Sequence, residues 1–173
     1  MTSLWTTDPF TQVYEAIWTD LENSAELMAS VKVNNRIKVA GDDVPANPGK
    51  GSISSSDVPE IAVLPASGSA VLHDRMHGAS TIIQDYAVIL TTGEKRASDP
   101  NNVSLFPLKW RILAALGRAG SAVEALAFVT RADVTDLAED IGIEERARGL
   151  GTWSMGLTVS VAMDFSLSDF AEE

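Results

Sequence analysis

The sequence predicts a single α+β domain in which a small antiparallel sheet is covered on one face by two helices. Three features predict this class: apolar residues at helical spacing near the N terminus, strict alternation near the C terminus, and apolar strands between them without regular crossover helices. The 173 residues match one domain, so residues 1–173 are assigned to it. A chain of this length buries about 70% of the surface that it exposes when unfolded, so it can form a core without disulfides.

The first helix is expected over residues 8–30. Asp8 supplies a side chain that can cap the N terminus, and Pro9 suits the first helical position. Acidic residues, Asp20 among them, occupy the face opposite an apolar stripe. The stripe consists of Phe10, Val13, Tyr14, Ile17, Trp18, Leu21, Ala25 and Met28. We interpret the segment as an amphipathic helix packed on the sheet.

A half-buried strand is expected over residues 31–39. Apolar residues occupy the odd positions, apart from Asn35, and polar or basic residues occupy the even ones. The outer face of this strand would carry Lys32, Arg36 and Lys38. The pattern therefore predicts a basic stripe on the surface of the sheet.

Two segments lack apolar periodicity. Residues 41–57 consist mainly of Gly, Pro, Ser, Asp and Asn, which predicts a mobile polar loop. A loop of this length in a compact domain is typical of a functional or disordered segment. Residues 166–173 are expected to form a flexible acidic tail.

Four further strands and a second helix complete the expected fold. The short apolar strand 61–64 lies between two prolines, which favours a place near the sheet edge. β-Branched and aromatic residues predict a strand over 81–92 that is largely covered on both faces. Apolar spacing predicts a helix over 107–116, which two glycines end. A strand is expected over 126–129, and strict alternation predicts the last strand over 153–165.

The chain is acidic, with a net charge of −11. Because affinity for phosphates comes from clustered Lys and Arg, such a surface repels nucleic acid on average. The charge is typical of a soluble protein, although a negative wall could also line a channel through which DNA passes. The absence of cysteine excludes disulfides and thiolate chemistry. Neither a signal peptide nor an apolar run of the roughly 20 residues that span a bilayer is expected.

The candidate catalytic and metal-binding motifs have little support. His73 and His77 stand four residues apart and could bind one metal ion from a helix, but flanking glycines favour exposed loop histidines. Lys50 lies in a Gly-containing stretch that lacks the spacing of a phosphate-binding loop. The acidic segment 133–145 lacks signs of the burial that paired catalytic carboxylates need. We expect no catalytic residue and no cofactor, while a ligand- or metal-binding domain using His73 and His77 stays open.

The order of the expected helices and strands along the chain can be compared with that of known protein families. The series comprises the helix 8–30, the polar loop, the strand 59–64, the strand 86–92 leading to a helix that ends at 110–116, and the closing strand 153–165. This order resembles the tail terminator, or tail completion, proteins of long-tailed phages. The resemblance implies a small antiparallel sheet flanked by helices and a structural protein without enzymatic activity.

The resemblance also implies partners and a location. Proteins of this family form a homo-oligomeric ring, a hexamer, which caps the tail tube and presents a surface for head joining. The expected partners are other copies of the chain, the tail tube protein and a head–tail connector protein, with DNA only as passing cargo and no membrane. The expected location is the virion, after assembly in the host cytoplasm. Other neck or head–tail connector proteins share this size and organisation and are the alternative.

A ring built from one chain brings two different patches into contact around the circle. We hypothesise that the basic stripe of Lys32, Arg36 and Lys38 meets an acidic patch on the neighbouring subunit. The acidic patch consists of Asp133, Asp136, Glu139 and Asp140. Such charges mainly set register and association rate, and apolar contacts supply most of the affinity. The competing interpretation places the acidic segment along the DNA channel.

Overall fold

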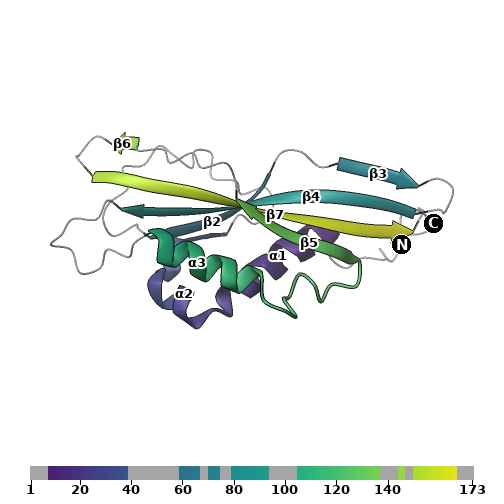
Figure 1. The fold of residues 1–173 in the computed structure, drawn as a ribbon, viewed down its shortest axis with the longest axis horizontal. Coiled ribbons are helices and arrows are strands. Elements are labelled where there is room, and N and C mark those ends of the chain that lie inside the picture. Colours follow the sequence, from purple (N-terminus) through teal and green to yellow (C-terminus); the bar gives the residue numbers. More distant parts are fainter. Residues whose placement is uncertain are drawn as a thin grey trace.

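A computed structural model describes residues 8–38, 59–66, 70–74, 79–93, 105–136, 144–146 and 150–166. The helices lie together on one side of a long, twisted sheet (Figure 1), which confirms the α+β class. The helices are α1 (Pro9–Glu22), α2 (Ala25–Ser30) and α3 (Leu105–Leu116), and a 3₁₀ turn η1 spans Val33–Asn35. The strands are β1 (Arg36–Lys38), β2 (Glu60–Pro65), β3 (Ala70–Asp74), β4 (Ala79–Gly93), β5 (Val129–Asp136), β6 (Glu144–Arg146) and β7 (Leu150–Ser166).

Two long strands form the axis of the sheet. β4 has 15 residues and β7 has 17, and they pair antiparallel from Ala79↔Ser166 to Gly93↔Thr152. β2 and β3 pair with the edge of β4 that faces away from β7. β5 and β6 pair with the edge of β7 that faces away from β4. Strands usually have about 5–6 residues. The β4–β7 ribbon therefore extends past the helices at both ends (Figure 1).

The antiparallel core β2-β4-β7-β5 confirms the expected sheet, with one departure. β1 pairs with β2 in parallel, through Arg36↔Ile61 to Lys38↔Val63. The short strand β2 therefore lies one position in from the edge. Alternation along β7 is confirmed, because Leu157, Val159 and Val161 are all buried.

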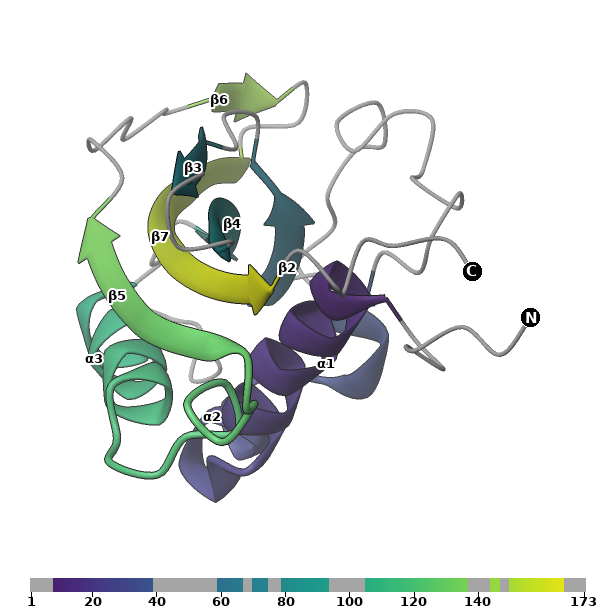
Figure 2. The same ribbon diagram turned by 90° about the vertical axis from the view of Figure 1, so that its right-hand side faces the viewer.

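The strand predicted over 81–92 is largely covered on both faces, but the two faces are not covered equally. Tyr86, Val88 and Leu90 point towards the helices and are buried, whereas Ile83 and Ile89 on the other face are half-buried. Figure 2 shows the reason, since the three helices gather beneath the strongly curved sheet. A continuous run of apolar residues predicts burial but does not say how many layers cover the strand.

The N-terminal helix is capped as the sequence predicts. Asp8 accepts a hydrogen bond from the backbone N–H of Thr11 at 2.9 Å and another from the Thr11 hydroxyl at 2.6 Å, and Pro9 opens α1. The Thr11 hydroxyl is the main cause that lowers the pKa of the Asp8 carboxyl. The prediction of a single helix over residues 8–30 was wrong, however, because α1 ends at Glu22. Ser24 caps a new helix, α2, with its hydroxyl accepting from Leu27 N at 3.4 Å.

Replacing Asp8 with alanine should lower the free energy of unfolding by about 1 kcal/mol at neutral pH, because two donors lose their acceptor. The lowered pKa means that this stabilisation is present above the unfolded-state pKa and is lost as pH falls through the folded-state value. Urea titrations at pH 7 and at successively lower pH would measure the difference. Asp8→Asn is the control, since asparagine still caps. An undiminished difference in acid would contradict this account.

The segment after α2 differs most from expectation. The strand predicted over 31–39 is reduced to β1, preceded by η1. Val33, expected on the inner face, is 71% exposed, while Asn35, the polar residue of that face, is buried, so Val33 interrupts the predicted alternation. The Asn35 amide donates to the Pro59 carbonyl at 3.2 Å and thereby attaches the turn to the start of β2. This tertiary contact outweighs the local pattern.

A second correction concerns the chain after α3. α3 begins at Leu105, two residues before the predicted start, and the strand predicted over 126–129 is mostly turn. The next strand, β5, begins at Val129 and continues into the acidic segment. Phe128 packs into the core instead, with its ring 5.8 Å from that of Phe165. The loop 41–57 lies outside the described residues, as does the tail after Ser166, which ends β7.

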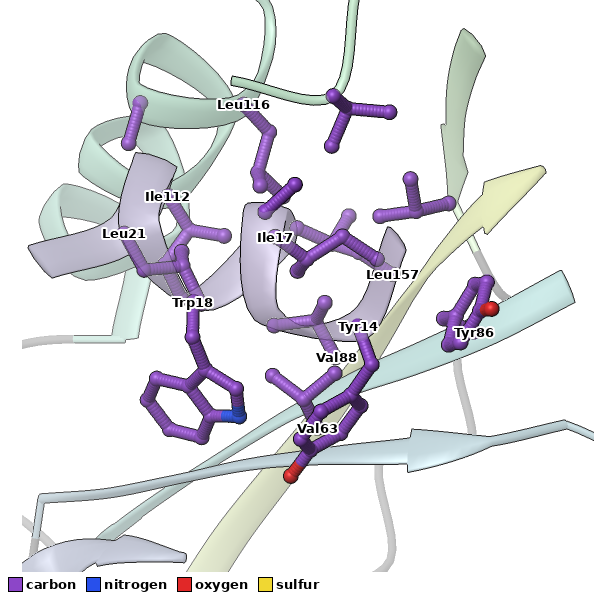
Figure 3. Packing of buried hydrophobic residues seen from close by; sticks show 14 of the residues in the cluster. Tyr14, Ile17, Trp18, Leu21, Val63, Tyr86, Val88, Ile112, Leu116 and Leu157 are labelled. Atoms are coloured by element: carbon purple, nitrogen blue, oxygen red, sulfur yellow. The ribbon is translucent and has the colours of Figure 1, made fainter. Parts of the chain in front are cut away.

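The core fills the space between the helices and the sheet (Figure 3). Ile17, Trp18 and Leu21 of α1 are fully buried, and Leu108 and Ile112 of α3 lie beside them. The sheet contributes Ile61, Val63, Tyr86, Val88, Leu90, Leu157, Val159 and Val161. The two helical segments therefore share one core with the four antiparallel strands.

Tyr86 fixes the start of α1 on the sheet. Its hydroxyl donates to the Phe10 carbonyl at 3.0 Å. Burial, followed by the negative charge of Asp8, raises the pKa of this hydroxyl above its ordinary value. The hydroxyl therefore stays protonated and able to donate at physiological pH.

Candidate interaction surface

The predicted basic stripe does not form one strand face. Lys32 is exposed and precedes η1, outside any strand. The Arg36 guanidinium donates to the carbonyls of Met28 at 3.2 Å and Val31 at 3.1 Å, so it satisfies the C-terminal end of α2. Arg36 therefore acts within its own subunit.

Lys38 also binds within the subunit. Its amine forms an ion pair of 2.8 Å with Glu22 and lies 5.2 Å from the centre of the Trp18 ring. Exposed ion pairs of this kind contribute little to stability. Of the three residues of the predicted basic stripe, Lys32 is exposed and takes part in none of the contacts just described.

The acidic patch is only partly described. Asp133 lies on β5, on the sheet face away from the helices, and pairs with Arg131 at 2.5 Å. Asp136 is the last residue of β5. Glu139 and Asp140 lie outside the described residues. The contact between this patch and the basic residues of a neighbour stays a prediction, now without a continuous basic stripe to face it.

Asp20 lies in the core, and the prediction that placed it on the opposite face of the first helix was wrong. It was assigned to the polar face of α1, yet it is fully buried. One carboxylate oxygen accepts from Arg118 at 3.1 Å and from Ala122 N at 2.7 Å, and the other accepts from Val123 N at 3.3 Å. Helical spacing from Val13 could have revealed it, because position 20 falls on the same stripe. Asp20 thereby joins α1 to the turn after α3.

An unusual surface lies on α3. Trp110 is 71% exposed, and Pro107 and Ala114 are exposed on the same side of the helix. We call these three residues the Trp110 face. The opposite side of α3 is buried in the core, so the helix is apolar on both sides. Exposed apolar patches often mark contacts with other proteins, and tryptophan is enriched among the residues that dominate such contacts, so the Trp110 face is a candidate protein contact.

Basic residues flank the Trp110 face. Lys109 is half-buried on one flank. Arg111, on the other, donates to the Ser30 hydroxyl at 2.5 Å and lies 3.7 Å from the Glu26 carboxylate. α3 carries no acidic residue. The surface thus combines an aromatic anchor with a cationic rim.

His73 does not lie in the helix that the hypothetical metal site required. His73 lies in β3, where its backbone is in register with Ser80, and neither the expected loop nor a helix forms there. His77 lies outside the described residues. A strand at His73 rules out the helical i, i+4 arrangement that the metal site required. Among the residues that the structure describes, no group of three or more potential metal ligands comes together.

Comparisons with known proteins add no identity. No protein-family model matches the chain, and no curated protein matches it significantly. Within the described part of the chain, no helix has both the length and the apolar character needed to cross a membrane.

Proposed function

We propose that this chain is a virion structural protein of the tail terminator type. It would form a ring on the end of the phage tail tube, stop tube growth and present a surface to a head–tail connector protein. The observation that carries the proposal is the Trp110 face, because a tryptophan that is 71% exposed on the solvent side of a helix favours a protein-binding role.

The architecture supports the proposal. An N-terminal helical segment, an antiparallel sheet and a second helix before the closing strand follow the order that the sequence resemblance implies. The long β4–β7 ribbon also gives the subunit an extended shape beyond its helical layer (Figure 1). An extended subunit can contact neighbours along a ring while leaving a central passage for DNA.

Tail length in particles produced without this gene tests the proposal directly. We expect overlong tails without joined heads, measured by electron microscopy, because no other subunit would stop tube growth. Complementation with the wild-type gene is the control and should restore the length. Tails of normal length with unjoined heads would identify another neck or connector protein, and unaltered infectious particles would overturn the phage assignment.

A further inference from the structure

We draw no further inference here: the strongest candidate, the Trp110 face on the solvent side of α3, belongs to the surface already described, the basic residues beside it have partners within the subunit, and nothing in the structure shows what covers it.

Discussion

Replacing Asp20 with alanine is expected to lower the free energy of unfolding by about 3 kcal/mol or more, because a buried acceptor of three hydrogen bonds is lost. The carboxylate accepts from Arg118, Ala122 N and Val123 N, and the two backbone donors have partly or fully buried surroundings. Water cannot easily replace the carboxylate there. Urea unfolding followed by circular dichroism would measure the loss.

Two further variants separate the contributions of charge and hydrogen bonding at Asp20. Arg118 is 39% exposed in its side chain, so Arg118→Ala should cost only about 1 kcal/mol, because water can replace part of the contact. Asp20→Asn keeps one acceptor oxygen and should fall between the two. An Asp20→Ala variant as stable as Arg118→Ala would contradict the structural role of the backbone contacts.

The parts of the fold that sequence predicted well are those set by local periodicity. The alternation over 153–165 follows from a strand with one face on a core, and β7 has that arrangement. The apolar stripe of α1 and the Asp8 cap also depend on neighbours within four residues. Such patterns specify which face of an element is buried, but they did not reveal the break at the Ser24 cap or the 40% exposure of Phe10.

The failures occur where contacts between distant residues decide the structure. Asn35 is buried although it is polar, because its amide binds the Pro59 carbonyl, 24 residues away, and a 3₁₀ turn replaces the first part of the expected strand. Residues 122 and 123 bind Asp20, which lies on α1, and a turn replaces most of the strand expected nearby. Neither contact has a signature in the local sequence. The hypothesis of a contact between the basic stripe and the acidic patch stays a prediction. Two of its basic residues, Arg36 and Lys38, have partners within the subunit, which the sequence did not indicate.

Two residues have a burial opposite to the one that is usual for their residue types. Asp20 is charged and fully buried, whereas Trp110 is aromatic and 71% exposed. Periodicity alone places Asp20 on the apolar stripe of α1, and it marks α3 as apolar on more than one side. Residue type misled the assignment of Asp20, and the exposure of Trp110 needed the structure. Both residues show that position on the helix and residue type must be weighed together.

Trp18 should show the second large effect, and its direction depends on the replacement. Trp18 is fully buried between α1 and the sheet (Figure 3), so Trp18→Ala should cost about 3–5 kcal/mol through lost burial and the cavity that remains. The indole Nε1, however, has no hydrogen-bond partner among the residues that the structure describes. An unsatisfied buried donor is itself destabilising.

Trp18→Phe removes that donor while keeping an aromatic ring. We expect it to cost less than about 1.5 kcal/mol, because relief of the unsatisfied N–H offsets part of the lost volume. Leu21→Ala, a fully buried neighbour on the same helix without a polar atom, is the control and should cost about 2–5 kcal/mol. Thermal and urea unfolding would rank the three variants. A Trp18→Phe variant as unstable as Trp18→Ala would contradict the expected relief of an unsatisfied N–H.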